Sequence, residues 1–271
     1  MAVLYVAFTN NIYKQNKLKI KNTYIMKQLV KTADPTSLPT VNYDRVIYNS
    51  ETDNVIIKGA NDNGHPYVDL GLPSGLKWAK YNVGATSETQ EGDHFMWGET
   101  KPNTTYNWEH YKFYAAPSAT TDPPITLTKY NTSTDYGKNL DGMSTLRPED
   151  DAARANMGGD WRMPTKDNFQ ELITYTNNEW IGDFDGNGTS GYKFTSKKDT
   201  NNYIFIPASQ WYQDFSTYIQ DISYGVWSSS LRTSLPREAW GLNFNSNHIK
   251  AEEEYTCTYN RYYGMVVRGV L

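Results

Sequence analysis

The sequence predicts an α+β domain over residues 65–271, made of short strands, long loops and one or two helices, behind a small β-rich module at residues 1–64. Three observations predict this class. Runs of β-branched and aromatic residues recur in the C-terminal half, for example at 203–207. Apolar residues in 165–173 are spaced to share one helix face. Gly, Asn, Asp and Pro cluster between these segments, which is typical of loops.

Residues 1–64 are expected to form an attachment and oligomerisation module. The first 31 residues carry six lysines and no acidic residue, whereas the rest of the chain is acidic overall. This uneven charge suggests two parts with different partners, although a solvated lysine-rich surface explains it equally well. The lysines lack the interleaved arginines and aromatics of a specific nucleic-acid binder, so we expect no nucleic-acid partner.

A hairpin is predicted near the end of this module. β-rich runs at 44–48 and 54–58 flank a polar turn. Because a two-stranded hairpin is marginally stable alone, it is expected to pack on the next domain or on copies of itself. The segment resembles the repeated strand–turn–strand units of phage fibre and tail proteins, which trimerise. The stretch 59–66 is rich in Gly and Asn without apolar periodicity, and we place the domain boundary after residue 64.

The composition excludes several classes of protein. The single cysteine, Cys257, can form neither an internal disulfide nor a multi-cysteine metal site. Apolar runs fall short of the roughly 18 residues of a transmembrane helix, so no membrane insertion is expected. Residues 1–9 lack a basic segment and a small-residue cleavage site, so no signal peptide is expected.

The elements of the main domain are predicted in chain order. Residues 98–140 are polar, aromatic and rich in proline, which indicates a long loop. Proline and acidic residues followed by alanines predict a short helix within 147–157. Later segments are β-rich, and in one of them large apolar residues alternate with Gly and Asn. These predicted strands cover 203–207, 225–230, 239–245 and 264–271.

The stretch 158–165, Gly-Gly-Asp-Trp-Arg-Met-Pro-Thr, is expected to be a tight structural turn. Its glycines allow backbone angles that are closed to other residues. Trp161 is large enough to need burial, with its indole N–H satisfied. Thr165 can cap the following helix, but Asn168 stands where a full capping box has Glu or Gln, so the cap is expected to be partial. A catalytic role for the turn is the less favoured interpretation.

Five blocks of the main domain resemble, in the same order, a paralogous domain that is abundant in Bacteroidetes and Fibrobacter. The blocks are 67–79 (YVDLGLPSGLKWA), 95–100 (FMWGET), 146–165, 226–230 (VWSSS) and 264–268 (GMVVR). That family has a C-type-lectin-like fold, and it includes relatives of formylglycine-generating enzymes and variable ligand-binding proteins that retroelements diversify. The resemblance covers about residues 65–271 and implies a scaffold for binding.

Departures from the family limit what the resemblance implies. Formylglycine-generating relatives depend on cysteines of their own, and Cys257 alone cannot reproduce a cysteine pair. Calcium-dependent lectins use Glu-Pro-Asn or Gln-Pro-Asp with Trp-Asn-Asp, and the sequence contains none of these triplets. We therefore expect no enzyme activity and no calcium–sugar site of that type.

Other candidates for chemistry favour structural interpretations. The adjacent acids 149–151 are interpreted as charges at a helix start rather than as paired catalytic carboxylates. The four histidines lack metal-ligand spacing. One loop resembles half of an EF-hand, with Asp183, Asp185 and Asn187 as candidate calcium ligands, but Phe194 stands where a bidentate Glu is needed. A simple turn is favoured there, no cofactor is expected, and any calcium would bind weakly.

The segment 230–263 is the predicted ligand-binding region. Core-type residues are separated there by Asn, Tyr, Arg, Ser, Thr and His, which is the composition of adaptable binding surfaces, and aromatic rings of this kind also stack on sugar rings. In the resembling family this is the diversified region. An ordinary exposed polar loop is the alternative. The predicted ligand-binding residues are Arg232, Asn243, Asn245, Asn247, His248, Tyr255, Tyr259, Arg261 and Tyr262.

The predicted function is that of a non-enzymatic structural and adhesion protein of a virion, a phage head or tail fibre component. Residues 65–271 would bind a glycan or protein on the host surface, and residues 1–64 would attach them to other virion proteins in a homo-oligomer, expected to be a trimer. Weak single sites would then combine through a high effective concentration. The alternative is a bacterial cell-surface or pilus-associated binding protein.

Overall fold

The structure is a computed structural model that describes residues 42–49, 54–115, 125–186, 188–213, 216–217, 223–253 and 257–271. Side chains are described from Asp62 onward, with those of Asp185, Ser216 and Thr217 left out. Residues Asp44–Leu271 form one compact unit. Most of the predicted attachment module, including its lysine-rich start, lies outside the described residues.

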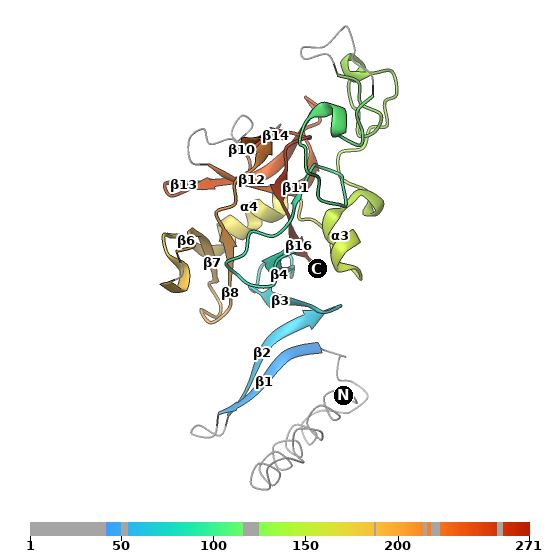
Figure 1. Cartoon of the computed structure of the whole chain (residues 1–271). Coiled ribbons are helices and arrows are strands. Elements are labelled where there is room, and N and C mark those ends of the chain that lie inside the picture. The colour runs from blue at the N-terminus through green and yellow to red at the C-terminus, as the bar shows by residue number, and fades with distance from the viewer. Residues whose placement is uncertain are drawn as a thin grey trace. The chain divides into compact units, whose positions relative to one another are not determined.

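Strands dominate the described residues (Figure 1). The α-helices in these ranges are α3 (Ala152–Met157) and α4 (Lys166–Tyr175), accompanied by single turns of 3-10 helix, η1 (Trp108–His110), η2 (Thr134–Tyr136), η3 (Pro148–Asp150) and η4 (Phe184–Gly186). The strands are β1 (Asn42–Asn49), β2 (Asn54–Asp62), β3 (His65–Asp69), β4 (Lys77–Asn82), β5 (His94–Phe95), β6 (Thr176–Ile181), β7 (Gly191–Ser196), β8 (Tyr203–Pro207), β9 (Tyr212–Gln213), β10 (Ser216–Thr217), β11 (Tyr224–Leu231), β12 (Glu238–Asn245), β13 (His248–Lys250), β14 (Thr258–Asn260), β15 (Met265–Val266) and β16 (Arg268–Val270).

The predicted α+β, C-type-lectin-like class is wrong, because the described residues form mainly β-sheet. Both predicted helices exist, but α3 has six residues and α4 has ten. Two helices of this length contribute far fewer residues than the strands. Aromatic strands that pair over long sequence distances form the body of the domain instead.

Three sheets and a two-stranded ribbon make up this body. The first sheet has the order β1-β2-β3-β4-β16, the largest has the order β13-β12-β11-β15-β5 with β14 also paired to β12, and the third has the order β6-β7-β8. The C-terminal strand β16 pairs with β4, with Val270 opposite Trp78. The prediction of a core strand near the C-terminus is therefore confirmed, and it brings both ends of the 65–271 segment into one sheet.

The largest sheet separates two aromatic clusters, whereas the alternation in 239–245 predicts one apolar face opposite a face of Gly and Asn. Leu242 and Phe244 on β12 pack in one cluster, together with Phe169 from α4. Ala239 on the opposite face of β12 packs in the other cluster, with Trp227 from β11. Helix α4 lies beside β11 and β12 and buries its apolar face there (Figure 1).

The 158–165 turn is a structural element, as predicted. Trp161 is fully buried, and its Nε1–H donates to the Asp62 carbonyl at 3.1 Å. Gly158 has φ +72°, and a Cβ there would lie 2.4 Å from the Asn63 amide nitrogen. The prediction of a partial cap on α4 is wrong, because Asn168 and Thr165 bond each other reciprocally in a complete capping box. The Thr165 backbone N–H donates to Asn168 Oδ1 at 3.0 Å, so asparagine accepts the same hydrogen bond that Glu accepts in a full capping box.

Candidate functional site

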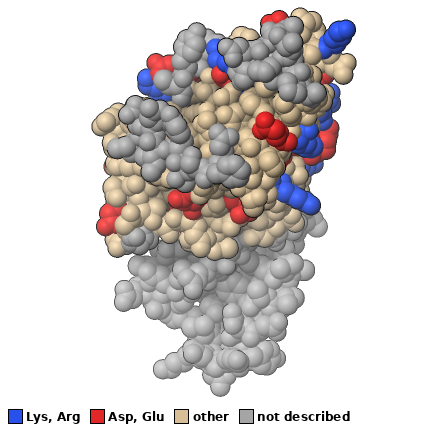
Figure 2. Space-filling view, turned by 45° about the horizontal axis from the view of Figure 1, so that its top comes forward, with Lys and Arg blue, Asp and Glu red and all other residues tan. Residues whose placement is uncertain are grey.

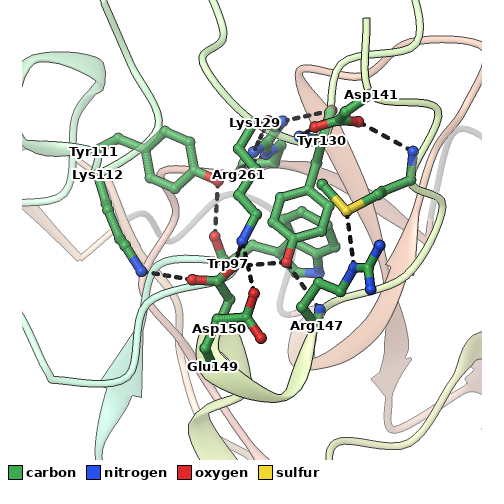
Figure 3. Close-up of polar contacts among 11 residues, drawn as sticks. Trp97, Tyr111, Lys112, Lys129, Tyr130, Asp141, Arg147, Glu149, Asp150 and Arg261 are labelled. Carbon is green, nitrogen blue, oxygen red and sulfur yellow. Dashed lines mark hydrogen bonds and ion pairs between the residues drawn. The ribbon is translucent and has the colours of Figure 1, made fainter.

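Arg261, a predicted ligand-binding residue, lies in the core rather than on a surface (Figure 3). Its Nε donates to the Tyr111 hydroxyl at 2.7 Å, and its two terminal nitrogens donate to the carbonyls of Tyr130, Pro236 and Lys129 at 2.9–3.1 Å. The guanidinium also lies 4.9 Å from the Trp97 ring centre. Carbonyls and ring faces therefore stabilise this buried charge.

A buried carboxylate, Asp150, anchors the long segment before it to the same region (Figure 3). It accepts hydrogen bonds from Lys112 Nζ at 2.6 Å, from Lys129 Nζ and from the Tyr130 hydroxyl at 2.7 Å. Burial acts to raise the pKa of Asp150, but these three hydrogen bonds outweigh it and lower the pKa. An ionised carboxylate with three hydrogen-bond donors of this kind ties chain segments together.

A polar chain at the end of β12 connects three predicted residues. Asn243 Nδ2 donates to the Tyr259 hydroxyl at 2.6 Å, and His248 Nε2 lies 2.8 Å from Asn243 Oδ1, which accepts from the Nε2–H tautomer. Burial raises the pKa of Tyr259, and burial together with Lys250 lowers the pKa of His248. Both groups are therefore neutral at pH 7, and the polar chain of Asn243, Tyr259 and His248 orients its side chains without carrying a net charge.

The remaining predicted residues differ in accessibility. Asn245 accepts hydrogen bonds from the backbone N–H groups of Asn247 and His248 and thereby shapes the β12–β13 turn. Asn247 is exposed, and Asn245 and His248 are half-buried. Tyr255 lies outside the described residues. Five predicted residues are buried and cannot themselves offer an exposed surface: Arg232, Asn243, Tyr259, Arg261 and Tyr262.

Aromatic side chains, of which only Tyr263 belongs to the predicted 230–263 segment, cover the region beside this polar chain. We define the aromatic face as the partly exposed residues Trp108, Trp211, Tyr212 and Tyr263. The Trp211 ring packs edge-on against Tyr259 at 5.1 Å, and it lies nearly parallel to the Tyr263 ring, with centres 6.4 Å apart. Buried Tyr259 thus connects the aromatic face with the polar chain.

A glycine allows aromatic rings to lie close to the sheet here. A Cβ on Gly264 would lie 2.4 Å from the Tyr106 ring, which is too close for any side chain. Tyr106 in turn stacks on Tyr212 at 5.6 Å. Glycine in a strand beside an aromatic pair is a sequence signal that could have identified these residues.

The aromatic face and the half-buried polar residues near it offer ring faces beside hydrogen-bonding groups. Figure 2 brings the upper end of the view in Figure 1 forward, and among the described residues near the centre of that view most are neither acidic nor basic. The strands β10, β12 and β14 lie toward this end of the molecule in Figure 1. The combination of rings and polar groups suits a ligand that offers ring or apolar faces together with hydrogen-bonding groups.

The candidate calcium loop is only partly described. Asp183 accepts a hydrogen bond from the Gly188 backbone N–H, which closes a turn. The Asp185 side chain and Asn187 lie outside the described part, so the calcium prediction stays a prediction. Within the described residues, His, Cys, Asp and Glu do not gather in any group of three that could hold a metal ion.

Comparisons with known proteins gave no match: no family model, no curated protein and no solved structure matches this chain. Among the helices that the structure describes, none has the length and apolar character needed to cross a membrane. The site is thus defined by its own geometry.

Proposed function

We propose that the protein is a non-enzymatic adhesion protein of a virion, and that its main domain binds a glycan or protein on the host surface through the aromatic face. The observation that carries this proposal is the group of four partly exposed Trp and Tyr rings, which the contacts of Tyr259 link to half-buried His248. Rigid amphipathic rings bury much area on binding and lose little rotamer entropy. They also stack on the apolar faces of sugars.

The polar chain supports binding rather than proton transfer. The hydroxyl of Tyr259 and the amide of Asn243 bond each other, and His248 is held through the same amide. A general acid or base needs a pKa near the working pH, whereas burial shifts the pKa of Tyr259 upward and that of His248 downward, away from neutrality. We propose that this polar chain fixes the orientation of the aromatic face. We also propose that binding uses no cofactor.

Residues 1–64 would attach the domain to other virion proteins. We propose a homo-oligomer, a trimer, because several weak sites on one particle bind a surface far more tightly than a single site does. The alternative function is a binding protein on a bacterial cell surface or pilus, and the same aromatic face would serve it. Mass spectrometry of purified virions separates the two, since absence of the protein from the particles would rule out the virion proposal.

The binding site is tested with the full chain on a glycan array and on host cells. Trp211→Ala and Tyr263→Ala should each weaken binding at least about tenfold if stacking on these rings supplies about 1.4 kcal/mol or more. Tyr175→Ala is the matched control, because Tyr175 is 50 % exposed on α4 and does not belong to the aromatic face.

Near-UV circular dichroism would confirm that each variant keeps its packed aromatic core. Trp211→Phe, which keeps an apolar ring at the same position, should bind better than Trp211→Ala. Binding by all folded variants with the affinity of the unaltered chain would refute the placement of the site.

A further inference from the structure

A cavity of about 290 Å³ lies between the segment 145–148, the start of α3 and the 160–165 turn. It shares no residue with the aromatic face. Leu146 and Met163 contribute apolar walls, and Arg162 and Thr165 contribute polar ones. This volume lies near the lower limit of about 300 Å³ for small-molecule sites, which suits one compact chemical group.

Arg162 is the unusual group in this cavity, because much of its hydrogen-bonding capacity is unused. One terminal nitrogen, Nη1, donates to the Met163 carbonyl and to Asn168 Oδ1, both at 3.1 Å. Within the described ranges, Nε and Nη2 have no acceptor, and no carboxylate forms an ion pair with the guanidinium. Neither nitrogen is among the fully buried side-chain atoms that lack a partner, so both stay open to solvent and can donate to an anion.

The backbone beneath this side chain is fixed. The Arg162 N–H donates to the Val270 carbonyl at 3.0 Å, and the Val270 N–H donates back at 2.8 Å. On the other side, the capping box of α4 holds Asn168, which accepts from the guanidinium. Burial lowers the pKa of Arg162, and Asp151 acts in the opposite direction without overcoming the effect. The guanidinium is thus held in place and incompletely compensated before any ligand arrives.

Two acidic residues line the same cavity, and both have other partners. Asp151 accepts hydrogen bonds from the backbone N–H groups of Arg154 and Met163, at 2.9 and 2.8 Å. Asp160 is almost fully exposed and lies 3.4 Å from Arg154. Neither neutralises Arg162, but their charges would repel a doubly charged anion such as a phosphate more strongly than a singly charged carboxylate.

We propose that this cavity binds the carboxylate of an acidic sugar, a uronate, through the free Nε and Nη2 of Arg162. A guanidinium presents these two nitrogens as a fork that matches both oxygens of a carboxylate. The Thr165 hydroxyl and the Asp160 carboxylate provide a donor and an acceptor for ring hydroxyls, and the partly exposed Leu146 side chain contacts the apolar face of the ring. The inference does not depend on the aromatic face being a binding site.

Isothermal titration of the full chain with sodium glucuronate tests this proposal. Glucuronate should bind, and glucose, which has the same ring without the carboxylate, should not. Arg162→Gln should weaken glucuronate binding about tenfold or more. Arg147→Gln is the matched control and should leave binding unchanged, because Arg147 is exposed and does not line the cavity.

Arg162→Lys keeps the charge without the fork, so its affinity for glucuronate should lie between those of the unaltered chain and Arg162→Gln. This variant keeps the test informative even if Arg162→Gln does not fold. Inorganic phosphate and alanine are titrated in the same way. Phosphate tests whether the cavity binds any anion, and alanine tests whether it binds any amino-acid zwitterion. No binding of glucuronate, equal binding of glucose, or tighter binding of either competing probe would overturn the proposal. Unchanged affinity in both folded Arg162 variants would overturn it as well.

Discussion

Replacement of Arg261 should destabilise the whole domain rather than remove a surface contact. The side chain is fully buried and donates four hydrogen bonds from a charged group, each worth about 1.5–3 kcal/mol. Arg261→Ala removes all four and opens a cavity among aromatic rings, where large-to-small substitutions cost about 2–5 kcal/mol. Because neighbouring contributions do not add fully, we expect a loss of at least about 4 kcal/mol.

A loss of this size approaches the total stability of a typical domain, about 5–15 kcal/mol, so Arg261→Ala is expected to be largely unfolded. Arg261→Lys is the measurable variant. It keeps the charge but loses the planar fork that reaches Tyr111 and the carbonyls together, which we expect to cost about 2 kcal/mol.

Urea unfolding followed by tryptophan fluorescence measures both changes. Arg147→Lys is the matched control and should stay within about 0.5 kcal/mol, because the Arg147 side chain is exposed. If Arg261→Lys loses less than about 0.5 kcal/mol and still folds, the structural role assigned to Arg261 is wrong.

Two further predictions concern residues that hold segments together. Trp161→Ala removes a fully buried ring and its hydrogen bond to the Asp62 carbonyl. Urea unfolding should show that the free energy of unfolding falls by about 3–5 kcal/mol. A fall of less than about 1 kcal/mol would contradict the burial of the ring. Asp150→Asn should cost about 1–3 kcal/mol at pH 7. Folding lowers the pKa of Asp150 from its usual 3.8, so the stability that the ionised carboxylate supplies is present above pH 3.8 and declines as the pH falls below it. The difference in unfolding free energy between the unaltered chain and Asp150→Asn should therefore narrow at pH 3. A difference that stays constant between pH 7 and pH 3 would contradict the pKa assignment.

Local features of the fold could be predicted from the sequence because short-range physics determines them. The 158–165 turn, the start of α4 at Thr165 and the alternation along β12 each follow from a residue pattern within ten positions. Burial of Trp161 follows from its size alone. The fold class could not be predicted in the same way, because it depends on pairings such as that of β16 with β4, whose partners are separated by almost the whole domain.

The candidate site was harder to predict because the same residue types serve two purposes. Tyr, Arg and Asn in an irregular segment suggest an adaptable surface, yet Tyr259 and Arg261 fill the core of this domain. Composition does not reveal this, since a guanidinium can be stabilised by carbonyls from remote segments such as Lys129 and Pro236. Trp211 was missed because it lies outside the predicted 230–263 segment, whereas Tyr263 lies inside that segment but was left out of the predicted ligand-binding residues.

The aromatic face is held rigidly because its rings are continuous with the core. Trp227 in the core contacts Tyr259 at 5.9 Å, and Tyr259 contacts Trp211 at the surface at 5.1 Å. The hydroxyl of Tyr259 is fixed by Asn243, so the intermediate ring has little freedom to move. Because a pre-organised surface loses less entropy on binding, the buried residues of the 230–263 segment would support the proposed recognition by holding the exposed rings in place, without contacting the ligand themselves.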